Sequence, residues 1–239
     1  EFTYEILDGE GTTATGTVHV VVTVVRPAEP VVGAEPGAVA SYFEIPQSSV
    51  LPDFDGLDAY ADEIVPRVDY PSTGGPFAGS GRNDFVAAVF EGWLEVPTSG
   101  VWRLFTHSDD GSRLFVGDTL VVDNDGLHGM VERSGDIGLA AGRHPIRVEF
   151  FENQGGAGLI VRWSGPGVGK TIVPASAWSH GGGTPDPDID GDGLVDGADL
   201  AILLGHWGVC GDCPADLDGD GVVGGGDLAV LLAAWTSTP

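Results

Sequence analysis

The sequence is poor in positive charge. Its 239 residues include 10 lysines and arginines against 36 acidic residues, which gives a formal net charge of −26 at pH 7. Nucleic acids and anionic membranes attract clustered Lys and Arg, so this balance argues against both as partners. The shortage is greatest in residues 186–239, where eleven aspartates occur without one Lys or Arg. Calcium would relieve the resulting repulsion.

Long apolar runs, an initiator Met and a signal segment are also missing. No apolar run reaches the roughly 18 residues that a membrane span needs. The chain opens in a strand-like segment, so we expect the C-terminal part of a longer protein whose signal lies upstream. Such a protein would be secreted or displayed at the cell surface. Hydrophobic residues make up 42% of the chain, which suffices for ordinary buried cores.

Cysteine is limited to Cys210 and Cys213. In a secreted chain so close a pair indicates a short-range disulfide. A zinc site that also used His206 would lack a fourth strong ligand. A redox role is a further alternative, but the acidic surroundings oppose formation of a thiolate.

Catalytic signatures are scarce as well. Ser112 is close in sequence to His107 and Asp110, but no oxyanion loop or Gly-x-Ser-x-Gly elbow accompanies them. Carboxylates are too numerous to single out a glycosidase pair. We therefore expect no active site within these residues, although the parent protein is compatible with a glycoside hydrolase.

The N-terminal residues 1–25 predict a β-hairpin with strands at 2–7 and 15–25. Asp8-Gly9-Glu10-Gly11 between them is typical of a turn. Two strands alone do not bury a core, so the hairpin is interpreted as the end of a larger sandwich domain. Phe2-x-Tyr4 and the turn resemble the last strands of cadherin-like or immunoglobulin-like repeats. Residues 26–39, rich in Pro, Ala and Gly, predict a linker.

Residues 40–178 predict one β-rich domain, a sandwich or barrel, because short strands alternate with turns. Within 144–151, Ile146, Val148 and Phe150 should share one face, with Arg147, Glu149 and Phe151 on the other. The expected strands are 85–90, 92–96, 101–106, 113–116, 120–123, 136–140, 144–151 and 158–163.

Two adjacent carboxylates, Asp109 and Asp110, follow one of these strands. The segment Ser108-Asp109-Asp110-Gly111 is expected to form a turn that points both side chains outward at the end of a sheet. Like charges so close repel unless a cation joins them, and a hard cation prefers oxygen ligands. The pair therefore predicts a calcium-dependent binding site. A turn without metal is the alternative.

The segments around this pair resemble the PA14 family. They are Phe90-x-Gly92-x-Leu94-x-Val96-Pro97, Ser108–Leu114, Val122–Gly129, Ala141-Gly142-x-His144-x-Ile146-x-Val148-x-Phe150-Phe151-Glu152, Gly156-Ala157 and Trp163-x-Gly165-Pro166. The resemblance implies a β-sandwich or barrel that is appended to glycosidases, adhesins and toxins and often binds carbohydrate.

The same resemblance implies a ligand set. In carbohydrate-binding members a cis peptide joins two adjacent aspartates that ligate calcium, and vicinal sugar hydroxyls complete the shell. An amide from a later loop contributes, for which Asn153 and then Gln154 are the candidates. His128 is a further candidate, with a hydrogen-bonded packing role as the alternative.

Residues 179–187 predict a second linker, and residues 188–236 contain a duplication with an offset of 28 residues. Aspartates at loop positions 1, 3, 5 and 12, with a glycine at position 6, match the EF-hand calcium loop. Gly193 and Gly221 permit the sharp bend, and Gly224 replaces the ninth-position Asp in the second loop. The predicted ligands are Asp188, Asp190, Asp192, the carbonyl of Leu194, Asp196 and Asp199 in the first loop, and Asp216, Asp218, Asp220, the carbonyl of Val222 and Asp227 in the second.

Each loop leads into a predicted amphipathic helix whose apolar face is expected to pack against its counterpart. The faces consist of Leu200, Leu203, Leu204 and Trp207, and of Leu228, Leu231, Leu232 and Trp235. This repeat resembles dockerin type I, which implies docking onto a cohesin module and assembly of polysaccharide-degrading systems. The loop positions that read the partner in that family are here Gly197-Ala198 and Gly225-Gly226, a departure from its pattern.

Together these patterns predict a mainly β chain with a small α-helical double EF-hand module at its end. The predicted function is calcium-dependent carbohydrate binding and attachment without catalysis. A structural or adhesive spacer with a calcium-stabilised terminus and no glycan ligand is the alternative.

Overall fold

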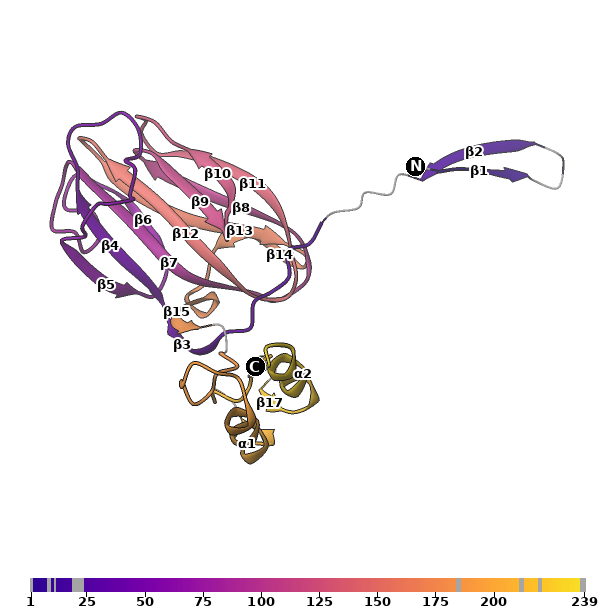
Figure 1. Cartoon of the computed structure of the whole chain (residues 1–239). Coiled ribbons are helices and arrows are strands. Elements are labelled where there is room, and N and C mark those ends of the chain that lie inside the picture. Colours follow the sequence, from indigo (N-terminus) through magenta and orange to yellow (C-terminus); the bar gives the residue numbers. More distant parts are fainter. Residues whose placement is uncertain are drawn as a thin grey trace.

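The computed structural model describes residues 2–7, 10, 12–18, 24–183, 186–210, 213–218 and 221–236. Within these ranges the chain is mainly β, as predicted (Figure 1). The first elements, β1 (Phe2–Leu7) and β2 (Thr13–Val18), form an antiparallel hairpin in which Leu7 lies opposite Thr13. The tip residues Asp8, Gly9 and Gly11, and residues 19–23, lie outside the described residues. The likeness to cadherin-like repeats stays a prediction.

Two antiparallel sheets form the central domain. The larger sheet has eight strands in the order β10-β9-β12-β7-β15-β3, with β4 on β7 and β5 on β4. The smaller has five strands in the order β11-β8-β13-β14, with β6 on β13. The larger sheet contains β3 (Val32–Pro36), β4 (Ala38–Glu44), β5 (Ala61–Val65), β7 (Val86–Val96), β9 (Ser112–Val116), β10 (Thr119–Asn124), β12 (Gly142–Glu152) and β15 (Trp178–Gly183). The smaller contains β6 (Asp69–Thr73), β8 (Gly100–Asp109), β11 (Val131–Leu139), β13 (Ala157–Gly165) and β14 (Val168–Ile172).

Alternating side chains build the core between the sheets. Ile146, Val148 and Phe150 of β12 are buried in the main cluster, which confirms the predicted inner face. Phe151, expected on the outer face, does point away from that cluster, yet it is fully buried in a second one. Residues 43–54 supply most of the second cluster, because they cross the outer face of the larger sheet.

The four tryptophans of the domain serve the core or its edge. Trp102, Trp163 and Trp178 are buried, and the rings of Trp102 and Trp163 lie 4.8 Å apart. Trp93 is half-buried, and its indole N–H donates to the carbonyl of Gly181 at 2.9 Å. These rings therefore contribute to packing. Trp102, Trp163 and Trp178 expose no indole face on which a sugar could stack.

Strands are longer or more numerous than the sequence predicts. The two strands expected at 85–90 and 92–96 form one continuous strand, β7, and β8 extends three residues further than expected, to Asp109. The elements β4, β5, β6 and β14 were not predicted, since β5 and β6 expose most of their side chains and carry no clear apolar alternation.

The two segments expected to be linkers are instead largely paired. Within 26–39, β3 pairs with β15 and residues 38–39 begin β4. Arg26 also bonds through its backbone to Gly138 and Ala140, and the Glu29 amide donates to Arg143. Within 179–187, residues up to Gly183 continue β15. Many of their backbone partners are distant in the sequence, as in the pairing of β3 with β15 and of Arg26 with Gly138, and local composition does not reveal such partners.

This pairing fixes where the chain enters and leaves the domain. Val32 and Gly183 are direct partners at the outer ends of β3 and β15, which lie side by side (Figure 1). β15 joins the sheet beside Trp93 and Leu94 of β7. Val86, at the other end of β7, pairs with Glu152. At about 3.3 Å per residue, roughly 25 Å of strand separates the two places.

The C-terminal region contains two loop–helix units. α1 (Gly197–Gly205) and α2 (Gly225–Ala233) follow the two acidic loops, and β16 (Gly208–Val209) pairs with β17 (Val222–Val223). Leu203 and Leu231 are fully buried in a small shared core with Val195, Leu217 and Val223. No helix in the described ranges is long and apolar enough to cross a membrane.

The predicted apolar helix faces are only half correct. Leu200 and Leu228 border the small core, but Leu204, Trp207 and Leu232 are each 52% exposed and Trp235 is 39% exposed. Both helices end before their tryptophans, so the four-residue spacing no longer places these rings on the buried side. In the connector, a disulfide joins Cys210 and Cys213.

Candidate functional site

The acidic pair lies at one end of the sandwich, where β8 finishes and the chain turns into β9. The peptide bond between Asp109 and Asp110 is cis, the form that the PA14 resemblance implies. Asp109 is half-buried on β8, opposite Gly158 of β13, whereas Asp110 is only 7% exposed. The two carboxylates thus come from adjacent positions that differ in their access to solvent.

Backbone amides hold the Asp110 carboxylate in place. Its Oδ1 accepts from the His128 amide and its Oδ2 from the Asn153 amide, both at 3.0 Å. Each oxygen of an ionised carboxylate has two acceptor sites, so both oxygens retain capacity for a cation. The predicted loops around His128 and Asn153 are therefore brought to the pair, but by their main chains.

Asp109 has a more open environment. Its Oδ2 accepts from the Ser72 hydroxyl at 3.1 Å, and no group in the described part of the chain donates to its Oδ1. The backbone of Gly156 approaches the same carboxylate so closely that a Cβ there would lie 2.9 Å from Oδ2 and 2.8 Å from Ser72 Oγ. A larger residue at this position would therefore have to shift the side chains of Asp109 and Ser72.

Negative charge accumulates around the pair. Burial raises the pKa of Asp109, the Ser72 hydrogen bond opposes this effect, and the charge of Asp110 adds to it. Glu152 is fully buried, and neither of its oxygens has a hydrogen-bond partner of ordinary geometry among the described residues. Burial first, and then the charges of Asp110 and Asp109, raise the pKa of Glu152 to about 8. The end of the sandwich therefore favours a bound cation electrostatically.

The side chains of the remaining predicted ligands lie as follows. The side-chain oxygen of Asn153 accepts from the Ser48 amide at 3.2 Å, and Gln154 is exposed. The ring nitrogens of His128 lie 2.9 Å from the Gly129 carbonyl and 3.0 Å from the Asn124 carbonyl. The imidazole is thus engaged within its own loop, while its backbone amide serves Asp110.

Several residues of the site were missed by sequence reasoning. Ser72 comes from the unpredicted strand β6, and no local pattern relates it to Asp109. Beneath the turn, the buried hydroxyls of Ser108 and Ser112 lie 2.8 Å apart, and Asn124 donates to Ser108 at 3.0 Å. Ser108 and Ser112 occupy inward positions in the alternation of their strands, and this alternation predicts that their hydroxyls are buried beneath the turn.

The first C-terminal loop gathers carboxylates at its start. Ligand atoms of Asp188, Asp190 and Asp192 lie within 4.8 Å of one another. Gly193 has a φ of +90° and Gly221 one of +85°, so both sixth positions adopt the bend that only glycine takes readily. Asp196, predicted as a ligand, caps α1 by accepting from the Ala198 amide at 2.8 Å. The Leu194 amide donates to Asp192 at 2.9 Å.

The twelfth-position aspartates brace both loops. Asp199 is buried and accepts from the amides of Ile189, Asp190 and Asp196, which lower its pKa, led by the Asp196 amide. Its equivalent Asp227 is also buried, and its Oδ1 accepts from the Leu217 amide at 2.6 Å.

In the second loop, ligand atoms of Asp216, Asp218 and Asp227 lie within 4.8 Å of one another. Asp216 is 2% exposed, and its Oδ1 has no hydrogen-bond partner among the described residues. A buried, unpartnered carboxylate oxygen inside a carboxylate cluster fits a hard cation such as Ca²⁺. Asp220 lies outside the described residues, and Val222 lies in β17.

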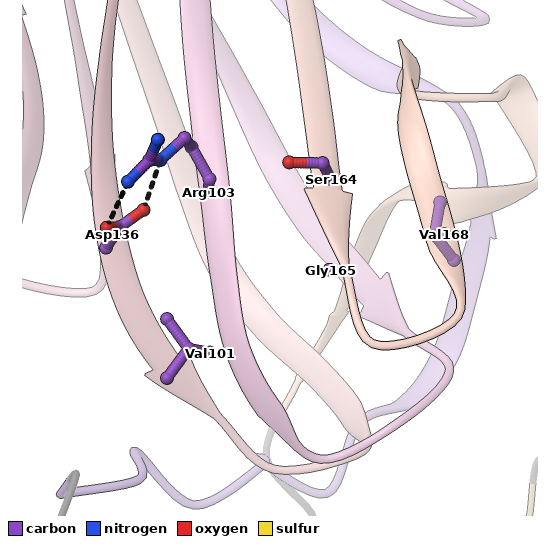
Figure 2. A pocket seen from close by; sticks show the side chains of 6 residues that line it. All are labelled: Val101, Arg103, Asp136, Ser164, Gly165 and Val168. Carbon is purple, nitrogen blue, oxygen red and sulfur yellow. Dashed lines mark hydrogen bonds and ion pairs between the residues drawn. The ribbon is translucent and has the colours of Figure 1, made fainter. Parts of the chain in front are cut away.

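Two further polar side chains of the domain, His107 and Arg103, contact side chains other than the acidic pair. His107 lies against Arg162, with Nδ1 and Nη1 3.4 Å apart, and not against Ser112. Arg103 and Asp136 form a bidentate pair with two contacts of 2.6 Å beside a hollow of about 330 Å³ on the outer face of the smaller sheet (Figure 2).

The chain belongs to the PA14 domain family, whose pattern matches residues 35–177. It is 28% identical over 131 residues to the Anti-sigma-I factor RsgI3 of Acetivibrio thermocellus, a match covering 54% of this chain and 20% of that protein. A solved anti-sigma factor domain-containing protein is 26% identical with a TM-score of 0.52, covering 60% of this chain and 48% of the other. This chain therefore spans less than half of either relative.

A solved PA14 sugar-binding domain from an RTX adhesin is 22% identical, with a TM-score of 0.53 over 61% of this chain and 99% of that domain. This likeness shows the fold. The family match and the solved neighbours together confirm the predicted PA14 domain.

Proposed function

We propose that this protein binds carbohydrate through a calcium ion held by Asp109 and Asp110. The observation that carries the proposal is the arrangement of two adjacent carboxylates at an open end of a PA14 sandwich. Asp110 is anchored by two amides, while one oxygen of Asp109 stays free of donors among the described residues. The sugar-binding activity named for the similar adhesin domain supports this assignment.

The bound calcium would supply a hard Lewis-acid centre for hydroxyl groups. Ca²⁺ takes six to eight oxygen ligands, so two carboxylates leave several positions for loop amide oxygens and for vicinal hydroxyls of a glycan. Gln154 is exposed and Asn153 is half-buried at the rim, and both supply amide oxygens. Ser72 orients Asp109, and the absence of a side chain at Gly156 lets both side chains keep this position.

A glycan array with the full chain tests this proposal. We expect glycan binding in the presence of calcium and none with chelator. Either substitution, Asp109→Asn or Asp110→Asn, should abolish the binding seen in calcium. Asp62→Asn, at an exposed position of β5, is the matched control and should bind as the unsubstituted chain does. Binding that survives both substitutions, or the absence of binding to any glycan on the array, would refute the proposal.

We further propose that the C-terminal loops are two calcium sites of a dockerin-like module that attaches the secreted protein to a partner. The two carboxylate clusters and the unpartnered Asp216 oxygen support the calcium part. The exposed Leu204, Trp207, Leu232 and Trp235 support the attachment part, because they recur at equivalent places in both repeats. A cohesin-like module in a polysaccharide-degrading assembly is the proposed partner.

Calorimetry and circular dichroism test the C-terminal module. We expect heat of calcium binding and a gain of helix on adding calcium to the chelated chain. Asp216→Asn should remove one binding event while leaving that of the first loop. Absence of heat and of helix gain would exclude calcium sites, and absence of binding to cohesin modules would exclude that partner.

A spacer role is the second candidate, and one observation favours it. Both oxygens of Asp110 already accept amide hydrogen bonds, so the turn is satisfied as a structural element. In that case the array shows no glycan under either condition, and the C-terminal calcium sites alone stabilise the chain. The role named for the anti-sigma relatives is not transferred, because the match covers 20% of RsgI3.

A further inference from the structure

A second hollow opens on the outer face of the larger sheet. It measures about 470 Å³, within the range typical of small-molecule sites. Its floor is formed by side chains of β9 and β12, and its wall by residues 51–55, the segment that buries Phe151 further along the same face. The lining residues are Leu51, Pro52, Asp53, Phe54, Asp55, Arg113, Phe115, Arg147 and Glu149.

Two half-buried aromatic rings, Phe54 and Phe115, face this hollow from different elements. Phe54 is held by an edge-to-face contact with Phe43, at 5.3 Å between ring centroids, and lies 5.6 Å from the Arg147 guanidinium. Phe115 is positioned by the pairing of β9 with β12, where it lies opposite Arg147. The rings therefore present fixed apolar surfaces to anything that enters.

Two guanidinium groups add fixed donors. Arg147 donates through Nη1 to Glu91 at 2.6 Å and through Nε to Glu149 at 2.9 Å. Arg113 donates through Nη2 to Asp125 at 2.9 Å. No acceptor among the described residues takes Nη2 of Arg147 or Nη1 of Arg113. Because Arg147 is held through two of its nitrogens and Arg113 through Nη2, the free terminal nitrogens belong to guanidinium groups that are already positioned.

The hollow is lined by two arginines and three carboxylates. The two arginines face carboxylates of Asp53, Asp55 and Glu149 across the same space, and the exposed Asp53 is fixed by accepting from the Asp55 amide at 3.0 Å. An anionic ligand would have to displace the existing ion pairs of Arg113 and Arg147. A neutral ring with an apolar face and hydroxyls at its edge satisfies the aromatic rings, the free donors and the acceptors together.

The hollow beside Arg103 lacks the aromatic rings. It is lined by Val101, Ser164, Gly165 and Val168 besides the ion pair, with no aromatic ring, and both contacting nitrogens of Arg103 bond to Asp136 (Figure 2). This hollow serves as a comparison, because its arginine also lies on an outer sheet face but has no aromatic ring beside it and bonds to Asp136 through two nitrogens.

We infer that the hollow between residues 51–55 and strands β9 and β12 is a calcium-independent subsite for a neutral saccharide unit. Phe54 and Phe115 contact the apolar ring faces, and Arg113 and Arg147 donate to hydroxyls. The subsite uses none of the carboxylates of the acidic pair, so it does not rest on the calcium site.

Protein-observed NMR of the full chain with chelator present tests this inference, with lactose and cellobiose as the probes. We expect at least one disaccharide to shift the side-chain signals of Arg147 and Phe115 in a saturable manner. Phe115→Ala removes a ring, and Arg147→Lys removes the planar fork but keeps the charge. Each should weaken binding about five- to tenfold. Arg103→Lys, the same exchange at the comparison hollow, should leave binding unchanged.

The subsite is overturned by no saturable shift with either disaccharide, by an affinity in Phe115→Ala and Arg147→Lys equal to that of the unsubstituted chain, or by equal shifts at Arg103. A response to a lysine-rich peptide and not to the sugars would also overturn it. Asp110→Asn separates this inference from the calcium-site proposal, because it should abolish calcium-dependent glycan binding and leave the chelator-resistant shifts intact.

Discussion

Glu152→Gln tests how burial and neighbouring charge act together at the acidic end of the sandwich. Glu152 is fully buried, its oxygens lack hydrogen-bond partners of ordinary geometry, and its pKa rises from 4.5 to about 8. Burial is the first cause, followed by the charges of Asp110 and Asp109. Glutamine keeps the shape and removes the ionisation.

The direction of the change in stability with pH follows from whether the folded or the unfolded chain holds the proton on Glu152. Between pH 4.5 and about pH 8 the folded protein keeps Glu152 protonated while the unfolded chain ionises it. Stability should therefore fall as pH rises through this window, and the loss is complete above it. At about 1.4 kcal/mol per pKa unit, the total is on the order of 5 kcal/mol. Below pH 4.5 the chain with Glu152 and the Gln variant should have similar free energies of unfolding.

Urea unfolding of the chelated full chain, followed by near-UV circular dichroism at pH 5 and pH 9, provides the assay. We expect the Gln variant to be several kcal/mol more stable than the unsubstituted chain at pH 9, and close to it at pH 5. Glu35→Gln, at an exposed position of β3, is the control and should keep the original pH slope. An unchanged slope in Glu152→Gln would refute the reasoning.

Three further outcomes follow from the geometry. Phe150→Ala, which removes a fully buried ring stacked on Phe77 at 4.2 Å, should lower the free energy of unfolding by about 3–5 kcal/mol, measured in urea. Gly156→Ala should displace the Asp109 carboxylate and weaken the proposed calcium binding there in calorimetry, whereas Gly74→Ala, with open space around it, should have no effect. Asp199→Ala should unravel the first loop, because three amides lose their acceptor, seen as faster hydrogen exchange at those amides.

Local alternation predicted the interior of the sandwich well. Ile146, Val148 and Phe150 follow a strict two-residue period, and sheet geometry alone then assigns their face. The same pattern did not predict the burial of Phe151, because that burial depends on residues 43–54, which cross the outer face of the sheet. The strand nature of 32–36 was hidden for a similar reason, because its partner is β15.

The candidate site shows the same division. Asp109, Asp110 and the EF-hand-like spacing were visible because their chemistry is concentrated in a few consecutive residues. Ser72 and Gly156 were not, because only the register of β6, β8 and β13 brings them to Asp109. Asp196 matched a ligand position, but as the residue before α1 it also satisfies an amide of the first helical turn.

The pairing of Val32 with Gly183 has a mechanical consequence. Because these two residues are directly opposed, tension between the flanking segments pulls them apart once the Arg26 and Glu29 contacts have parted. Such a load opens β3 from β15 one hydrogen bond at a time and meets low resistance. The Arg26 and Glu29 backbone contacts act as a second fastening on the N-terminal side. The acidic pair neighbours Glu152, whose partner Val86 lies roughly 25 Å along β7 from the place where β15 joins the sheet, so the proposed calcium site lies away from the strands that separate first.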